Sequence, residues 1–316
     1  MNALVATRDA YGKALIAVGA TDDRVVVLDA DLSKSTKTAG FAKEFPDRFI
    51  QMGIAEQDMM ATAAGLASAG KIPFASTFAL FATGRAFEQV RNSIAYPKQN
   101  VRIAATHAGI TVGEDGASHQ SVEDIALMRA IPGMTVIVPS DAVETEKAVV
   151  ASLSYEGPIY LRMGRDALPI LNDEDYDFEI GKAVTLREGT DVAILACGVM
   201  VTRALDAAVA LQAQGISAMV MNVHTIKPLD VEAVVRAAAA TGCIVTCEEH
   251  SIIGGLGGAV CEVLAENRPT PVVRLGVKDV FGQSGKPEAL MEAYGLTAGG
   301  VVEAAQTAIG RKKKEC

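Results

Sequence analysis

The sequence lacks any excess of positive charge, and this absence limits the kinds of partner that the protein can bind. Its 29 Lys and Arg are outnumbered by 38 Asp and Glu, which gives a net charge of −9 and a pI near 5.1. A nucleic-acid-binding protein needs a basic face to neutralise phosphates. We therefore expect no nucleic-acid partner.

Long apolar runs and paired cysteine motifs are also missing. No segment approaches the roughly 18 consecutive apolar residues of a membrane span, and the N-terminus does not resemble a secretory signal. Of the five cysteines, Cys243 and Cys247 lie in one apolar run, whereas a zinc site needs closer pairs. We expect buried free thiols, no metal site in this chain, no membrane contact and a cytoplasmic location.

A regular alternation of two kinds of segment runs through the chain. Runs rich in β-branched residues, such as 24–28 and 101–105, alternate with Ala-rich helical stretches such as 9–19 and 58–69. Half of the 316 residues are hydrophobic, so two domains of ordinary size can each bury a core. The pattern predicts an α/β fold with two domains, each a mostly parallel sheet covered by helices.

A polar and acidic stretch, 171–176, indicates where the chain divides. We place a first domain at 1–168, a linker at 169–183 and a second domain at 184–316. The glycine-rich segment 254–258 does not follow the order of a dinucleotide-binding fingerprint. It is better interpreted as a tight turn into a helix.

Ionisable side chains follow four predicted strands of the first domain. In open parallel sheets, ligands bind outside the carboxyl ends of the strands, which lie at one edge. A functional site at this edge is therefore expected from the residues alone. The four side chains are Asp31, Glu56, His107 and Arg165.

Two segments of the first domain carry the most specific signal. Gly53-Ile54-Ala55-Glu56-Gln57 opens a predicted helix, where an acid is common because the helix dipole favours it. The Gly-rich segment 106–120 then holds two of the four histidines, His107 and His119. Together, in this order, the segments resemble the pyrimidine-binding half of transketolase, and the resemblance extends into the second domain.

This resemblance implies a site for thiamine diphosphate. It implies that Glu56 hydrogen-bonds the ring nitrogen of the cofactor's aminopyrimidine, that Phe78 and Phe81 pack around that ring, and that Asp31 also belongs to the cofactor site. The cofactor then carries the difficult chemistry. The two Phe also fit ordinary core packing. Gly84 stands where the family usually has a Tyr, so one flank of the ring must differ.

The resemblance also implies the sugar site. His107 and His119 contact sugar oxygens and transfer protons, which makes them catalytic together with Glu56. Asp115 recognises a sugar hydroxyl, although an Asp before Gly116 is also typical of a simple turn.

Three further residues are placed by the resemblance at the phosphate end of the sugar: Arg8, Ser35 and Arg165. An Arg fork suits phosphate oxygens. Arg162 lies close enough in sequence to be an alternative to Arg165.

The motif that holds the cofactor's diphosphate is incomplete. The family uses Gly-Asp-Gly followed by a later Asn, but the only candidate here is Glu114-Asp115-Gly116, and residues 117–171 contain no Asn. The chain therefore resembles the C-terminal subunit of a split transketolase. A partner, the N-terminal subunit, would hold the diphosphate and Mg²⁺ or Ca²⁺, and an α2β2 assembly is expected.

The function implied is transfer of a two-carbon ketol unit from a ketose phosphate to an aldose phosphate. Three alternatives remain open. Deoxyxylulose-phosphate synthase shares Gly-Ile-Ala-Glu-Gln but typically has Asp-Arg-Ala-Gly where this chain has Thr106-His107-Ala108-Gly109. The β subunit of 2-oxoacid dehydrogenases normally lacks His107 and the Gly113–Gly116 combination. A non-catalytic paralogue is the third, and retention of the whole residue set counts against it.

Overall fold

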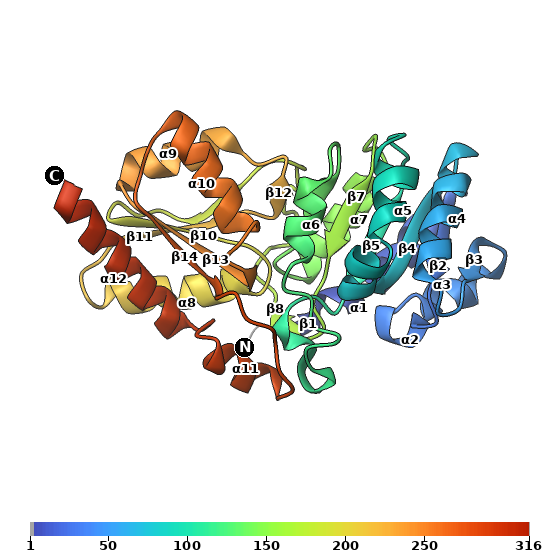
Figure 1. Cartoon of the computed structure of the whole chain (residues 1–316), viewed down its shortest axis with the longest axis horizontal. Helices are drawn as coiled ribbons and strands as arrows, with labels where there is room; N and C mark the ends of the chain where they lie inside the picture. The colour runs from blue at the N-terminus through green and yellow to red at the C-terminus, as the bar shows by residue number, and fades with distance from the viewer. Residues whose placement is uncertain (1–2, 316) are drawn as a thin grey trace.

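The computed structural model describes residues 3–315, with side chains described as far as residue 312. Two α/β units lie side by side, the N-terminal one blue to green and the C-terminal one yellow to red (Figure 1). Each contains a mostly parallel sheet with helices on both faces, which confirms the predicted fold class. No helix within residues 3–315 is long and apolar enough to cross a membrane.

The first unit is built on a seven-stranded sheet of order β12-β6-β7-β5-β4-β2-β3. All neighbours pair in parallel except β12 with β6. Because successive parallel strands need a crossover, each is followed by a helix or an irregular turn at its carboxyl end. The strands are β2 (Val25–Asp29), β3 (Phe49–Gln51), β4 (Ile72–Phe78), β5 (Arg102–Thr106), β6 (Thr135–Ile137), β7 (Ile159–Arg162) and β12 (Thr225–Lys227).

Apolar side chains on both faces of this sheet pack against helices. One face is covered by α1 (Thr7–Thr21), α3 (Ala39–Glu44) and α7 (Ala142–Ser152). The other is covered by α4 (Glu56–Ser68), α6 (Asp124–Ala130) and an irregular helix. The irregular helix consists of a π-helical turn (Phe81–Arg85), α5 (Phe87–Gln89) and a second π-helical segment (Val90–Ala95), where the sequence predicts one regular helix.

The second unit has a five-stranded sheet of order β14-β13-β10-β11-β9, parallel except for the edge pair β11 and β9. Its strands are β9 (Val184–Arg187), β10 (Val192–Ala196), β11 (Ala218–Asn222), β13 (Ile244–Ser251) and β14 (Val272–Val277). Its helices are α8 (Met200–Gln212), α9 (Val231–Thr241), α10 (Leu256–Asn267), α11 (Pro287–Ala293) and α12 (Ala298–Glu315). Helices α8 and α12 cover one face, and α9 and α10 the other. Cys243 and Cys247 are buried and free, as expected.

The two units are joined by a strand and by side-chain contacts that the sequence does not predict. Strand β12, which follows the linker in sequence, joins the edge of the first unit's sheet beside β6. Next to it, Lys227 Nζ donates to the carbonyls of Arg129 (2.8 Å) and Ile131 (2.6 Å). One apolar core runs without interruption from the first sheet to α10. Within the N-terminal part of the chain, β1 (Leu4–Ala6) and β8 (Ala167–Pro169) form a separate two-stranded antiparallel pair.

Strand β13 is longer than the sequence predicts. We expect it to end at Thr246, but it continues to Ser251 and carries two buried glutamates, Glu248 and Glu249, near its end. Successive side chains of a strand point to opposite faces. Glu248 accepts hydrogen bonds from the first backbone N–H groups of α10, so that helix begins at Leu256 rather than at the predicted Ala259.

Candidate active site

The predicted site residues gather at the carboxyl ends of β2, β4, β5 and β7. Because β2, β4, β5 and β7 are neighbours in parallel, the turns that follow them lie at one edge of the sheet. Glu56 begins α4, which follows the sheet's edge strand β3. The sequence prediction of a common location is therefore correct for the strand ends.

Glu56 is buried at the start of α4, with 1% of its surface exposed. Its Oε2 accepts a hydrogen bond from Arg85 Nη1 at 2.8 Å, and the Arg85 side chain is half exposed. The Arg85 guanidinium also lies 4.5 Å from the centroid of the Phe81 ring. Sequence reasoning missed Arg85, because only the π-helical turn that contains it carries its side chain back over Phe81 and Glu56.

Two aromatic rings stand beside this carboxylate. Phe78, at the end of β4, and Phe81 are stacked with centroids 5.8 Å apart. The ring of His119 meets Phe81 edge-on at 5.4 Å and Phe78 at 6.3 Å. Gly84 is exposed, and a Cβ there would meet only the tip of Leu80, so no side chain replaces the family's Tyr at that position.

His107 occupies the turn directly after β5. Its φ of 56° places a non-glycine residue in the left-handed region, which is uncommon and concentrates at functional sites. The ring is buried and stacks on Phe78 at 3.8 Å. Arg8 Nη1 lies 3.2 Å from Nε2, and Thr106 Oγ1 lies 2.8 Å from Nδ1. Because a guanidinium can only donate, Nε2 is the acceptor and Nδ1 carries the proton.

The surroundings of His107 keep the imidazole neutral. Burial, together with the nearby positive charges of Arg8 and Arg165, lowers the pKa of His107 to about 3. The side chain is therefore a neutral hydrogen-bonding group across the physiological pH range. A neutral ring with one fixed tautomer can orient an oxygen atom without adding a charge to the site.

Positive charge gathers beside His107. Arg8 is partly buried, and its Nη1 donates to the Ser35 carbonyl at 3.1 Å. Arg165, one-third exposed, donates to the Val112 carbonyl and lies 3.6 Å from Asp115. Burial lowers the pKa of Arg8, the charge of Asp9 opposes this shift, and repulsion by the charge of Arg165 adds to it. An anion between them would relieve that repulsion.

The alternative residue Arg162 does not face this site. Only 5% of its side chain is exposed, and its Nε donates to Asp124 Oδ2 at 2.6 Å. Its Nη2 donates to the Glu249 carbonyl at 3.0 Å. With its guanidinium occupied in this way, Arg162 is a structural residue, whereas Arg165 is accessible.

Two acids with different positions lie at the end of β2 and in the turn that follows it. Asp31, which the sequence singles out, is exposed, with a φ of 63°, and its N–H donates to Gln51 Oε1 at 2.8 Å. Asp29, which the sequence does not single out, is buried and accepts from the hydroxyls of Thr36 (2.6 Å) and Thr38 (2.9 Å). Asp29 thus shapes the turn that carries Ser35.

The side chains present fit the pyrimidine half of the expected cofactor, thiamine diphosphate. A buried carboxylate with a nearby pair of stacked rings can accept a flat heteroaromatic ring that carries a hydrogen-bonding nitrogen. The described residues contain no group of three or more His, Cys, Asp and Glu that could hold a metal ion. The groups expected for the pyrimidine half of the cofactor are thus present in this chain.

Comparison with known proteins places this arrangement in a family. Residues 3–170 match the family model of the transketolase pyrimidine-binding domain, and residues 181–301 match the transketolase C-terminal domain. A protein of Methanocaldococcus jannaschii described as a transketolase C-terminal section is 53% identical over 92% of each chain. A 6-deoxy-6-sulfo-D-fructose transketolase subunit of Clostridium is 47% identical over 96% of this chain and 95% of its own length.

Among solved structures, a split-gene transketolase described as an inactive β4 tetramer superimposes with a TM-score of 0.92. It is 57% identical and covers 98% of this chain and 99% of its own. The fold and the matched domains define a two-domain subunit of a thiamine-diphosphate-dependent enzyme class. The chain belongs to the transketolase family, as a C-terminal section of the split type.

Proposed function

We propose that this chain is the catalytic half of a two-chain transketolase that moves a two-carbon ketol unit from a ketose phosphate to an aldose phosphate. The observation that carries the proposal is the arrangement at one sheet edge: a buried acid, stacked rings, two histidines and two arginines. In order along this edge, these groups would meet the cofactor's pyrimidine, the reacting carbons and the anionic end of the sugar.

Glu56 is the residue that we assign to the pyrimidine of thiamine diphosphate. When bound, the cofactor supplies the carbon nucleophile and accepts the electrons of the broken carbon–carbon bond. Glu56 holds its carboxyl at the buried start of α4, where a ring nitrogen can share a proton with it. Phe78 and Phe81 would bound the ring, and Asp31 would lie at the periphery of the cofactor site.

The two histidines and Asp115 are assigned to the sugar. His107 presents a neutral ring whose Nε2 accepts from Arg8, and a sugar hydroxyl would replace Arg8 as the donor to this nitrogen. His119 is partly exposed, and its Nδ1 lies 3.0 Å from Ser118 Oγ. It can exchange protons with sugar hydroxyl groups. Asp115, exposed beside Arg165, can accept a hydrogen bond from a sugar hydroxyl.

Arg8 and Arg165 are assigned to the far end of the sugar, together with Ser35. Two guanidinium groups that repel each other favour an anion between them. Their planar shape also suits phosphate oxygens. The Clostridium relative is named for a sulfonated sugar, whose sulfonate is also a tetrahedral anion with three oxygens. The same two arginines would serve either anion, so they define an acidic sugar rather than one particular sugar.

The partner in this proposal is an N-terminal transketolase subunit that holds the diphosphate and Mg²⁺. Its support is the missing diphosphate motif together with a similar split-gene transketolase that is described as an inactive β4 tetramer. We infer an α2β2 unit for the active form, because the pyrimidine and diphosphate sites must meet across an interface. The deoxyxylulose-phosphate synthase and dehydrogenase alternatives are disfavoured by His107, whose neutral ring belongs to the sugar site of the proposed enzyme.

A test of the substrate class is the substitution Arg165→Ala in the reconstituted pair. Loss of a charge-assisted contact with phosphate costs about 1.5–3 kcal/mol, so KM for phosphorylated sugars should rise roughly 10- to 150-fold. Hydroxypyruvate with an unphosphorylated acceptor should react nearly as before. Arg8→Ala should show the same selectivity, and the double variant should lose less than the sum of the two.

The matched control is Arg187→Ala, which removes a partly exposed arginine of β9 in the second unit. Its kinetics with both kinds of donor should remain those of the wild type. Equal losses with hydroxypyruvate and with phosphorylated donors in Arg165→Ala would contradict the assignment of an anion site.

A further inference from the structure

The segment that carries the two histidines and Asp115 is held by the second unit. Within this segment, residues 107–120, the backbone N–H of Thr111 donates to Glu249 Oε1 of β13 at 2.7 Å. At its far end, Gln120 Nε2 donates to the carbonyl of Gln283 at 2.9 Å. Both contacts reach from the first unit to the second, so the second unit fixes the segment at two places.

Glycines in the segment allow this close approach. At Gly109, whose φ is 80°, an added Cβ would lie 2.3 Å from Glu249 Oε1. At Gly116, whose φ is 76°, it would lie 2.5 Å from Ser284 Oγ. Both values are far inside van der Waals contact, so a larger residue would displace the Glu249 and Ser284 side chains from these positions. The glycine-rich character of the segment is thus explained by packing against the second unit as well as by turns.

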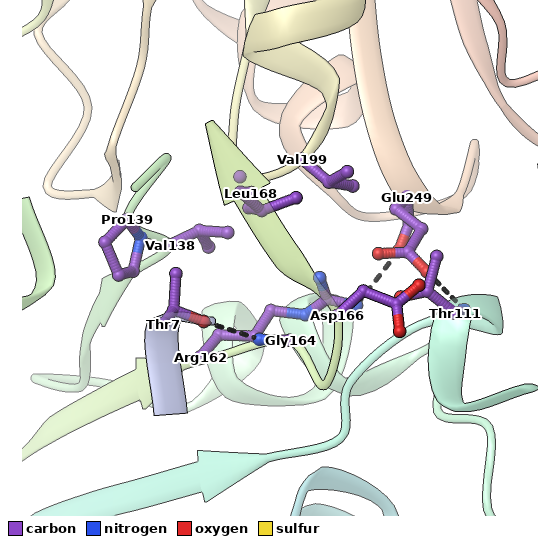
Figure 2. Close-up of a pocket in the computed structure, with 11 residues that line it drawn as sticks. Thr7, Thr111, Val138, Pro139, Arg162, Gly164, Asp166, Leu168, Val199 and Glu249 are labelled. Atoms are coloured by element: carbon purple, nitrogen blue, oxygen red, sulfur yellow. Dashed lines mark hydrogen bonds between the residues drawn. The ribbon is translucent and has the colours of Figure 1, made fainter. Parts of the chain in front are cut away.

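The Glu249 side chain is rigidly placed for this contact. Only 4% of it is exposed, and the carbonyl of the same residue accepts from Arg162 Nη2 at 3.0 Å. Arg162 is in turn fixed by Asp124. Figure 2 shows Glu249 reaching down from the second unit to Thr111, above Arg162 and beside a cavity of about 20 Å³. The cavity has room for about one water molecule, so the contact is nearly dry.

We propose that Glu249 is a positioning residue for ketol transfer: its carboxyl oxygen fixes the backbone at Thr111 and thereby places His107, Asp115 and His119 around the sugar. This inference rests on the proposed function, because it assigns a use to residues that the proposal places in the sugar site. It gives the second unit a defined part in the reaction, although none of the residues in the proposed sugar site belongs to it.

The hydrogen bond between Thr111 and Glu249 depends on the length of the glutamate side chain, its reach, more than on its charge. Burial raises the pKa of Glu249 to about 7, against the opposing influence of Arg162. The other acids near it are Asp124 of α6 and Asp166 at the same cavity. A carboxyl group offers an acceptor oxygen to the Thr111 N–H in both protonation states. Reach and charge can therefore be separated by two conservative substitutions.

The test compares Glu249→Gln, which keeps the reach and removes the charge, with Glu249→Asp, which keeps the charge and shortens the reach. In the isolated chain, hydrogen exchange of the amides in 109–120 should be about tenfold faster or more in Glu249→Asp, and unchanged in Glu249→Gln. In the reconstituted pair, Glu249→Asp should lower kcat/KM for sugars roughly 10- to 100-fold with unchanged affinity for thiamine diphosphate. Glu249→Gln should stay close to the wild type.

The matched control is Lys227→Met, which removes two hydrogen bonds between the same two units at a place remote from the segment. It should leave exchange in 109–120 and kcat/KM unchanged. The opposite ranking, with Glu249→Gln the damaged variant, would overturn the proposal in favour of a charge network. Equal kinetics and exchange in all variants would also overturn it. An inactive wild-type pair would refute the proposed function alone, because exchange would still report on the segment.

Discussion

Glu56→Gln in the reconstituted pair is expected to lower ketol-transfer turnover roughly 10²–10⁴-fold, the range typical of loss of a general acid or base. The carboxyl is buried at the start of α4 and is the acid that we assign to the pyrimidine nitrogen. An amide of the same shape can still accept a hydrogen bond, but it cannot give or take a proton. Turnover and thiamine diphosphate affinity should be measured together.

The control for this prediction is Glu146→Gln on α7. Glu146 also has a single close cationic partner, Lys13 at 2.9 Å, but the pair is exposed. Its substitution makes the same chemical change and should leave turnover within about twofold, because exposed ion pairs contribute little. Near-normal turnover in Glu56→Gln would remove Glu56 from the mechanism.

His107→Ala is expected to lower kcat roughly 10²–10³-fold, the cost typical of losing one preorganised hydrogen-bonding group, while thiamine diphosphate affinity changes little. The ring is stacked on Phe78 and bonded to Arg8, at the junction between the aromatic pair and the arginines. Because its pKa lies at about 3, the pH profile of the wild type between pH 5 and 8 should reflect other groups. His119→Ala should lower kcat in the same range, since His119 is the accessible ring.

His224→Ala is the matched control for the loss of a buried histidine. His224 is fully buried, its pKa is lowered by burial to about 4, and its ring lies 4.5 Å from that of Phe178 in the linker. Destabilisation alone should affect both variants alike, whereas loss of a sugar contact affects only His107→Ala. A parallel fall in cofactor affinity and activity in His107→Ala would mean that His107 is structural.

The order of strands and helices could be predicted because local pattern determines it. Runs such as 25–28 and, apart from Arg102, 101–105 are apolar on both faces, as is typical of parallel strands between helices, and they form β2 and β5. The common location of Glu56 and His107 followed from the rule that strand ends share one edge. That rule needs only the strand positions, and the runs 25–28 and 101–105 differ from β2 and β5 by one residue at their ends.

The parts that could not be predicted depend on contacts between distant segments. The Glu56–Arg85 pair requires a π-helical turn, for which the sequence carries no clear signal. The entry of β12 into the first sheet joins segments on either side of the linker. In the sequence, Glu249 is only one acid of Glu248-Glu249-His250. Its role becomes visible only in the structure, where its Oε1 lies 2.7 Å from the backbone N of Thr111. Sequence spacing carries no information on such pairs.

The central claim, that this chain is half of a transketolase, is tested most directly by assaying two-carbon transfer in mixtures with an N-terminal transketolase subunit. Thiamine diphosphate, Mg²⁺, a ketose phosphate donor and an aldose acceptor would be supplied to each chain alone and to the pair. We predict no transfer by either chain alone and transfer that saturates at equimolar chains. Transfer by this chain without a partner, or none by the pair with any acidic ketose donor, would contradict the account.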